Sequence, residues 1–347
     1  MSLINSSIKV KSKFFNKIKN KIGDVTYQSV VPSVLKNAKF NKKFLKYGKS
    51  IKELRDYNKK KKNAIIIGAG PSLRRNNQIK VIKKFANKFI IIACDGSLFY
   101  LLSNNIVPDL VVTFDPHPSR VIRWFGDEKL NKKKIAKDDY FARQDLEVMF
   151  NNELKMNEKV IKLFNKFAKK LNIAVGTSSA KNVVKRVISS KSNLYWWNPY
   201  LDDPKSKNSV TKKIFNMNKF PIVNTGGNVG ATAWMFADSL FGCEKIGLLG
   251  MDFSYYLDTK LSSTQYYDKL KKFTKKEDLK MFYSKIFNPK VKKYFYTDHV
   301  YAWYKKCLLE MINNSDAKTV NCSGGGILFD KNIQWTSLNN FCKQYSS

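Results

Sequence analysis

The chain has 347 residues, a hydrophobic content of 43% and a formal net charge of +37 at pH 7. This length suits two domains or one large α/β domain with additions, and the apolar content is ample for a core. No apolar run reaches the roughly 18 residues that a membrane span needs, and the first ten residues lack the apolar stretch of a signal peptide. These features predict a cytoplasmic protein.

The net charge and the cysteines narrow the functional class of the protein further. Lysine carries nearly all of the positive charge, and only seven residues are arginine, the residue that proteins favour for contacts with phosphates and base edges. We therefore disfavour a nucleic-acid partner and expect a general attraction for anionic substrates or an anionic membrane surface. The five cysteines form no C-x-x-C pair, which predicts reduced core residues, and the two histidines exclude a His-rich metal site.

Residues 1–60 are expected to form a basic N-terminal helical arm. Apolar residues between Leu3 and Ile22 recur about one or two helical turns apart among six lysines, which is the pattern of a basic amphipathic helix. Such a helix could lie on the inner face of the cell membrane as a peripheral contact, or it could pack on the catalytic domain.

The rest of the chain is organised around the stretch Asn63–Leu73. Three consecutive isoleucines predict a strand buried on both faces, which ends at Gly68-Ala69-Gly70-Pro71-Ser72. Glycines permit a sharp turn close to a ligand, and amides in a turn that opens a helix form an anion cradle. Pro71 suits a first helical turn, and Ser72 can cap the helix or bond a phosphate. The alternative is an ordinary strand-to-helix turn.

Similar apolar segments recur along the chain and alternate with helical patterns. They predict strands at Phe89–Ala93, Leu110–Phe114, Asn172–Val175, Leu194–Trp197, Lys245–Gly250 and Thr319–Asn321. This alternation is typical of a doubly wound, mostly parallel Rossmann-like α/β sheet with helical insertions. Residues 258–296 show a helical pattern. We expect the catalytic domain to span residues 61–330 and residues 331–347 to form a C-terminal tail.

Polar residues follow several of these strands. Asp95, Asp115 and Asp252 each stand at a strand end, and ligands of such sheets bind beyond the carboxyl ends of the strands. In a phosphoryl-transfer enzyme these carboxylates would hold Mg²⁺, and in a sugar transferase they would bond ribose or sugar hydroxyls. Each could instead cap the helix that follows. The small-residue turn Thr225-Gly226-Gly227-Asn228 opens an apolar helix and is a second candidate for a nucleotide.

Three segments, in their order and spacing, resemble the MptE-like domain. They are Gly-Ala-Gly-Pro-Ser-Leu at 68–73, Cys-Asp-Gly-Ser at 94–97 and the stretch Ile106–Asp115. That domain is shared by archaeal 6-hydroxymethylpterin diphosphokinases and the motility accessory factor (Maf) family, which is linked to flagellin glycosylation with nonulosonic acids. The second half is similar to bacterial sialyltransferases, through Thr225–Val229, Gly250–Tyr255 and Tyr296–His299 in that order.

The sialyltransferase resemblance implies roles for individual residues. It implies that His299 is the general base, and a histidine pKa of about 6.5 suits proton removal from an acceptor hydroxyl. It implies that tyrosines near the aspartate motif, here Tyr255 and Tyr256, steady the leaving nucleotide phosphate, which hydroxyl donors can do without a metal. It also implies that the Gly-Pro-Ser-Leu turn at residues 70–73 holds the nucleotide, and we expect Thr225–Asn228 to bind it together with Gly70–Ser72.

The leading hypothesis is a transferase with a nucleotide-activated donor, specifically a nonulosonic- or sialic-acid-like glycosyltransferase that needs no cofactor and acts on a glycan or protein. One alternative is a 6-hydroxymethylpterin diphosphokinase-like enzyme that uses ATP and Mg²⁺ at the same strand ends. Another is a non-catalytic basic adaptor for membrane or nucleic acid. The segment that contains His299 favours the glycosyltransferase, because phosphoryl transfer depends mainly on positioning and metal.

Overall fold

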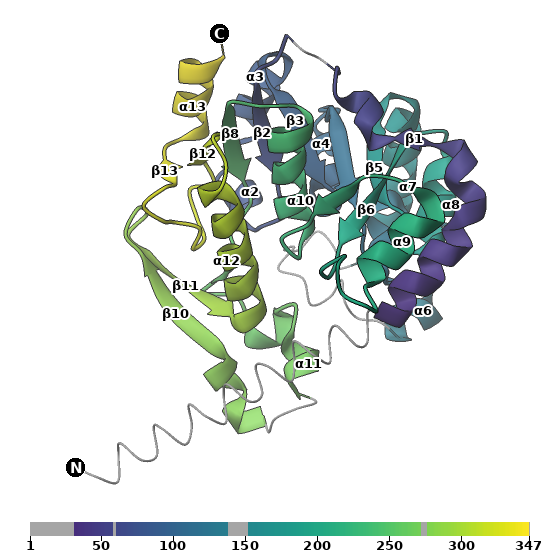
Figure 1. The fold of residues 1–347 in the computed structure, drawn as a ribbon. Coiled ribbons are helices and arrows are strands. Elements are labelled where there is room, and N and C mark those ends of the chain that lie inside the picture. Colours follow the sequence, from purple (N-terminus) through teal and green to yellow (C-terminus); the bar gives the residue numbers. More distant parts are fainter. Residues whose placement is uncertain (1–30, 58–59, 138–151, 272–275, 347) are drawn as a thin grey trace.

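A computed structural model describes residues 31–57, 60–137, 152–271 and 276–346 (Figure 1). Over these residues the chain forms a central sheet with helices on both faces and a small second sheet beside it. The predicted amphipathic helix of the first 30 residues lies outside the described residues. All five cysteines are free thiols, and four of them are buried.

The central sheet confirms the predicted doubly wound, parallel architecture. Its ten strands in the described chain run in the order β1-β6-β5-β4-β3-β2-β8-β12-β13, with β7 paired to β6, and every pairing is parallel. The strands are β1 (Lys49–Ser50), β2 (Asn63–Ile67), β3 (Ile90–Cys94), β4 (Leu110–Thr113), β5 (Asn172–Gly176), β6 (Asn193–Tyr200), β7 (Ile222–Asn224), β8 (Lys245–Leu249), β12 (Lys318–Asn321) and β13 (Gln334–Trp335).

Helices bury both faces of this sheet. Ile66 and Ile92 face a cluster formed with α10, η6 and α12, whereas Ile65, Ile67 and Ile91 face α2, α3 and α13, and farther along the sheet α4, α7 and α8 cover the same side. Strands buried on both faces carry uninterrupted apolar runs, which is why the isoleucine triplet predicted β2 correctly. The helices are the one at residues 31–41, α2 (Ser72–Arg75), α3 (Ile79–Phe85), α4 (Asp95–Ser103), α5 (Ile122–Phe125), α6 (Lys132–Lys137), α7 (Glu153–Phe167), α8 (Lys181–Ser189), α9 (Val210–Asn218), α10 (Val229–Met235), α11 (Tyr267–Lys271), α12 (His299–Asn313) and α13 (Leu338–Tyr345).

Short helical turns connect several of these elements. They are η1 (Lys42–Tyr47), η2 (Ile51–Leu54), η3 (Ala86–Lys88), η5 (Ala168–Lys170), η6 (Phe236–Leu240), which is a π-helical turn, η7 (Leu261–Ser263) and η8 (Lys276–Phe282). Among the described residues, no helix combines the length and the apolar character that a membrane crossing requires.

The strand order reverses beside β2. The chain builds β3 to β6 on one side of β2 and then returns to its other side for β8 and β12. In open parallel sheets, ligand sites lie beyond the carboxyl ends of the strands at such a reversal. We call the loops that follow the carboxyl ends of the central strands the rim.

The helical prediction for residues 258–296 is wrong over its last part. Residues 283–298 form the antiparallel strands β10 (Tyr283–Asn288) and β11 (Lys293–Asp298), and β11 also pairs with β9 (Tyr255–Tyr256). Along β11 the buried Phe295 and Thr297 lie on either side of the more exposed Tyr296, which is the period of a strand. Aromatic residues favour strands, and Pro289 at the turn does not allow one continuous helix.

The last residues, expected as a tail, take part in the core. β13 pairs with β12, and α13 places the fully buried Phe341 against Gly247 of β8, where a Cβ would lie 2.8 Å from its ring. The glycine therefore makes room for the aromatic ring at this crossing.

Two asparagines on the helix at residues 31–41 form hydrogen bonds with two loops of the rim. The side-chain amide of Asn41 donates to the carbonyls of Thr177 and Ser179, both at 2.9 Å. One turn earlier, Asn37 donates to the carbonyls of Pro116 at 3.0 Å and Ser178 at 3.2 Å. The loops after β4 and β5 are thus held by a helix that precedes the sheet in sequence.

We predict that Asn41→Ala lowers the free energy of unfolding by about 1–3 kcal/mol, because two buried carbonyls lose their donor. Urea denaturation followed by circular dichroism would measure the change. Asn37→Ala is the matched control on the same helix; its contacts are only partly buried, so water can replace the lost donor and the loss should be smaller. Equal losses in the two variants would contradict this account.

Candidate functional site

The rim brings together most of the residues that the sequence singled out. Gly68–Ser72 follow β2, Asp95 follows β3, Asp115 lies just after β4 and Asp252 just after β8. Since these four strands are neighbours in the sheet, their carboxyl ends form one continuous edge. The turn Thr225–Asn228 follows β7, farther along the sheet.

The glycine turn after β2 packs directly on the loop after β8. The Gly68 amide donates to the Leu249 carbonyl and the Gly70 amide to the Gly250 carbonyl, both at 2.8 Å. A Cβ at Gly68 would lie 2.5 Å from the Gly250 oxygen, and one at Gly70 would lie 2.6 Å from it. The two loops can approach this closely only because these positions lack a Cβ.

Ser72 directs both of its polar groups at Asp252. Its amide donates to Asp252 Oδ2 at 2.8 Å and its hydroxyl donates to Oδ1; the two residues are 0% and 2% exposed. The carboxylate therefore lies at the start of α2, where negative charge is favoured and where the sequence predicted a phosphate. The partly exposed surface of this turn comes from Ala69, Gly70 and Pro71.

Tyr256 lies beside the same turn. A Cβ at Gly325 would overlap the Tyr256 hydroxyl oxygen and lie 3.1 Å from the Cβ of Ser72, so these three residues adjoin. The guanidinium of Arg75 stacks over the Tyr256 ring at 4.1 Å, a cation–π contact that fixes the ring. Tyr256 is partly exposed, which leaves it accessible at the rim.

Tyr255, in contrast, is buried and serves the start of α12. Its hydroxyl donates to Asp298 at 3.1 Å, and Asp298 caps the helix by accepting from the amides of Val300 and Tyr301, both at 2.9 Å. Burial raises the pKa of Asp298 to about 6 and raises the pKa of Tyr255 well above its usual value. This hydrogen bond joins β9 to the first turn of α12, in addition to the pairing of β9 with β11.

His299 is the first residue of α12; the residue is partly exposed, but both of its ring nitrogens are buried. Its ring meets Phe282 edge-on, with the centroids 6.3 Å apart. One turn along the helix, Trp303 and Tyr304 press on the predicted nucleotide turn, since a Cβ at Gly227 would lie 2.9 Å from an atom of each ring. The predicted base and the turn Thr225–Asn228 therefore lie at the same corner of the protein.

Asp95 and Asp115 connect this corner to the sheet. Asp95 accepts from the Thr113 hydroxyl at 2.8 Å and from the Gly96 amide at 2.7 Å. Burial raises its pKa to about 7, and the charge of Asp115 adds to the increase. Asp115 also adds to the raised pKa of Tyr304, which is due chiefly to burial. Asp115 is thus close enough to both residues to act on them electrostatically.

These two carboxylates are the residues that would hold Mg²⁺ in a diphosphokinase. Mg²⁺ is commonly bound by one or two carboxylates together with substrate phosphates. Within the described part of the chain, no three His, Cys, Asp or Glu side chains form a group that could hold a metal by themselves. The donor set therefore fits Mg²⁺ only in company with a phosphorylated substrate.

Four residues around His299 were missed by sequence reasoning. The Tyr301 hydroxyl donates to the side-chain oxygen of Gln265 at 2.6 Å. The backbone amide of Gln265 donates to the Tyr255 hydroxyl at 3.1 Å. The hydroxyls of Tyr266 and Tyr304 lie 3.3 Å apart. No local pattern marks these residues, because they meet only when the region between β9 and α12 folds.

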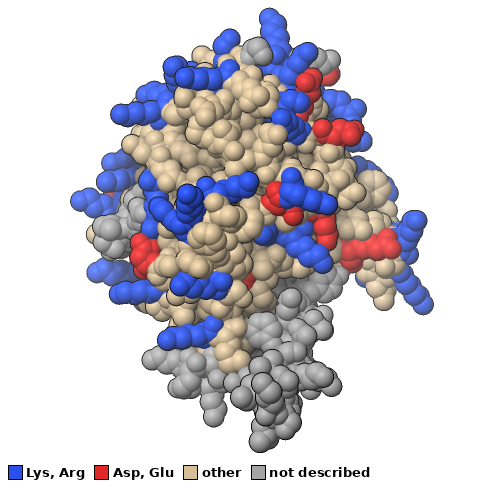
Figure 2. All heavy atoms as spheres, turned by 90° about the vertical axis from the view of Figure 1, so that its left-hand side faces the viewer, with Lys and Arg blue, Asp and Glu red and all other residues tan. Residues whose placement is uncertain are grey.

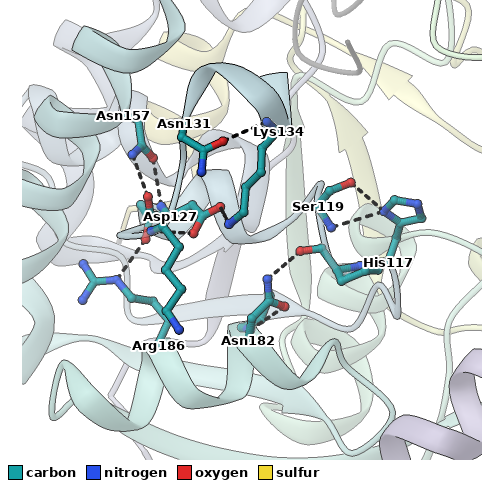
Figure 3. A network of polar contacts seen from close by, with 12 residues as sticks. His117, Ser119, Asp127, Asn131, Lys134, Asn157, Asn182 and Arg186 are labelled. Carbon is teal, nitrogen blue, oxygen red and sulfur yellow. Dashed lines mark hydrogen bonds and ion pairs between the residues drawn. The ribbon is translucent and has the colours of Figure 1, made fainter. Parts of the chain in front are cut away.

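A second network, also unpredicted, supports the loop after β4 (Figure 3). Asp127 forms an ion pair with Lys134 at 3.1 Å. Its backbone amide donates to Asn157 Oδ1, and its carbonyl accepts from Asn157 Nδ2, both at 2.8 Å. Arg186 donates to the carbonyls of Phe125 and Gly126 at 3.1 Å. These contacts tie the segment after α5 to α7 and α8, and at the start of α8 the Ala180 amide donates to the Asp115 carbonyl at 3.2 Å.

Comparison with known proteins places the chain in a family. A family model described as "6-hydroxymethylpterin diphosphokinase MptE-like" matches residues 32–258, and the chain therefore belongs to the MptE-like family. No curated protein matches. Among solved structures, the Maf glycosyltransferase from Magnetospirillum magneticum AMB-1 is similar, with 16% identity and a TM-score of 0.47 over 80% of this chain and 34% of that one. The chain thus spans about a third of that protein's length.

We predict that Asp95→Asn flattens the pH dependence of stability. With a folded pKa of about 7 and an ordinary value of 3.8, Asp95 binds its proton more tightly in the folded state, so the free energy of unfolding falls as pH rises through this interval. The asparagine Oδ1 can still accept from the Gly96 amide and its Nδ2 can donate to the Thr113 hydroxyl, whereas the asparagine does not titrate. Urea denaturation at intervals between about pH 5 and pH 8 would show the shallower fall.

Asp202→Asn is the control for this experiment. Although burial opposes it, hydrogen bonds from Ser209, Val210 and Thr211 lower the Asp202 pKa to about 2. Asp202 therefore titrates below the pH range of the measurement. Its replacement should leave unchanged the slope of the free energy of unfolding against pH. The pKa of Asp298, raised to about 6, leaves a residual slope in both variants. A slope in Asp95→Asn as steep as that of the unmodified protein would refute the raised pKa of Asp95.

Proposed function

We propose that this member of the MptE-like family is a transferase that uses a nucleotide-activated donor, and specifically a glycosyltransferase for a nonulosonic or sialic-acid-like sugar. The observation that carries the proposal is the position of His299. α12 starts one helical turn before Trp303 and Tyr304, which contact Gly227, and Asp298 secures that start. A base there would face an acceptor bound next to a nucleotide on the Thr225–Asn228 turn.

In the proposed reaction His299 accepts the proton of the acceptor hydroxyl. The acceptor oxygen forms a bond to the anomeric carbon of the donor sugar, the bond from that carbon to the phosphate oxygen breaks, and the nucleoside monophosphate leaves. A positioned base of this kind contributes about 10²–10⁴ to the rate. Asp298 and Tyr255 serve by fixing the first turn of α12 and thereby the imidazole.

The leaving phosphate requires hydrogen-bond donors. Of the two tyrosines implied by the resemblance, Tyr256 is better placed, because it is partly exposed beside Ser72 and Gly325. The Tyr255 hydroxyl already donates to Asp298. We therefore assign the phosphate contact to Tyr256 and a positioning role to Tyr255. Such donors stabilise developing charge without a metal.

A second candidate is a pterin diphosphokinase. The description of the matching family model favours it, and the matched residues end before His299. In this case Asp95 and Asp115 would hold Mg²⁺ with ATP, since phosphoryl transfer relies on metal and positioning, and His299 would have no chemical role. The two candidates therefore differ in nucleotide, metal requirement and dependence on His299.

We predict that His299→Ala lowers the transfer rate by about 10²–10⁴ while nucleotide binding survives. Release of CMP from CMP-sialic acid would measure the rate, and stabilisation by CMP would measure binding. His117→Ala is the matched control: it removes the other histidine of the chain but keeps the backbone amide that donates to Asp115. Near-normal turnover in His299→Ala would remove this residue from the mechanism.

Thermal shift separates the candidate functions. A ligand that binds only the folded state raises its melting temperature, so CMP, ATP and 6-hydroxymethylpterin would each be tested with and without Mg²⁺. We expect stabilisation by CMP that does not need the metal. Stabilisation by ATP that depends on Mg²⁺ would instead support the diphosphokinase, and stabilisation by none of the three would count against both enzymes.

A further inference from the structure

The helix at residues 31–41, η1 and α8 together present a surface that the proposed reaction does not use. We call it the Phe40 patch. It consists of the aromatic residues Phe40, Phe44 and Tyr47 and the lysines Lys39, Lys42, Lys43, Lys46, Lys181 and Lys185. All six lysines are exposed, and Tyr47 is 54% exposed.

Three ammonium groups of the patch converge on one ring. The Nζ atoms of Lys43, Lys181 and Lys185 lie 4.4, 5.6 and 5.7 Å from the centroid of the Phe40 ring. The three charges therefore lie within about 11 Å of one another, which is close to the Debye length at physiological salt. Like charges at this spacing repel, and an anion between them would relieve the repulsion.

The segments that build the patch contain no acidic residue to balance these charges. Residues 25–52 and 159–201 include no aspartate and no glutamate. Lysines are spread over the whole protein, and the face at the left of Figure 1 also carries Lys and Arg, but Asp and Glu lie among them (Figure 2). What distinguishes the Phe40 patch, at the right of Figure 1, is the convergence of its lysines.

The aromatic residues form a continuous row along the patch. The Phe40 and Phe44 centroids lie 5.6 Å apart, and those of Phe44 and Tyr47 lie 6.3 Å apart. An open hollow of about 450 Å³ is lined by Lys39, Phe40, Lys42 and Lys43. The patch thus offers apolar rings, a shallow depression and ammonium groups on flexible stems.

We propose that the Phe40 patch is a docking surface for an anionic lipid bilayer. The exposed Tyr47 ring, next to the partly buried Phe44 and Phe40, suits the level of the lipid headgroups, and lysine stems can lie on apolar surface while their charges reach lipid phosphates. The patch directly follows residues 1–30, whose sequence predicts a basic amphipathic helix. This inference does not depend on the reaction proposed above.

The same residues fit nucleic acid less well. The patch contains no arginine, the side chain that proteins prefer for bidentate phosphate and base contacts. Single-stranded nucleic acid also needs open ring faces on which bases stack, whereas the Phe40 ring is surrounded by ammonium groups from two elements. Lipid headgroups require neither feature.

The test is binding of the full chain to vesicles. Co-sedimentation would compare phosphatidylcholine vesicles with vesicles that also contain phosphatidylglycerol. We expect binding only to the second kind, weakened by added salt. In Lys43→Glu/Lys181→Glu/Lys185→Glu the partition coefficient should fall at least about 100-fold, since each lysine near the surface contributes roughly a factor of five.

A matched triple variant controls for net charge. Lys80→Glu/Lys83→Glu/Lys343→Glu makes the same charge change at exposed positions of α3 and α13, and it should keep its affinity within a few fold. If charge reversal disturbs folding, judged by circular dichroism, Lys43→Gln/Lys181→Gln/Lys185→Gln replaces the patch variant. An equal loss in patch and control variants, or no loss in the patch variant, would overturn the proposal.

Two further outcomes would also overturn it. One is failure of the unmodified chain to bind vesicles that contain phosphatidylglycerol. The other is binding to an oligonucleotide duplex that is tighter than binding to the vesicles and is lost in the patch variant, because that result would assign the surface to nucleic acid. A selective loss of vesicle binding in the patch variant alone would support the proposal.

Discussion

The hydrogen bonds between Ser72 and the carboxylate of Asp252 join the two sides of the strand reversal. A buried carboxylate is stable only when donors satisfy it, and here the donors come from a residue 180 positions away in sequence. The approach that makes this possible requires Gly68 and Gly70, whose Cβ atoms would collide with Gly250. The chain that follows Asp252 enters β9, and β9 pairs with β11. β11 in turn ends at Asp298, directly before α12. The position of His299 therefore depends on a contact made at the far side of the rim.

This arrangement divides the predicted site residues by what a substrate can reach. Ser72, Asp252, Tyr255 and Asp95 are buried and bond one another or their neighbours. Gly70, Asp115, Gly227, Asn228, Tyr256 and His299 are partly exposed, although both ring nitrogens of His299 are buried. The buried residues of the first group serve chiefly as the frame that holds the second group in place. The glycine turn, which was the strongest sequence signal, belongs mostly to the frame.

The sequence predicted what depends on local pattern and missed what depends on distant contacts. The isoleucine triplet and similar runs identified β2 and its neighbours, because strands buried on both faces leave an uninterrupted apolar signal. The lysines and aromatics of residues 283–298 were misjudged as helical, because one face of that hairpin is covered by α12 and the core while the other is partly exposed. The pairings of Ser72 with Asp252 and of Tyr255 with Asp298 span 180 and 43 positions. No periodicity in a single sequence encodes such distances.

The helix at residues 31–41 links the two proposals physically. On one side Asn37 and Asn41 hold the loops after β4 and β5, and on the other side Phe40 lies among the lysines of η1 and α8. Because the Asn41 contacts are buried and short, this helix couples the patch directly to the loops of the rim. A bilayer bound at the patch would then set the orientation of the rim relative to the lipid surface, and an acceptor presented at that surface would reach His299 from a fixed direction. The family model begins at residue 32, so this helix is part of the family's domain and not an appendage to it.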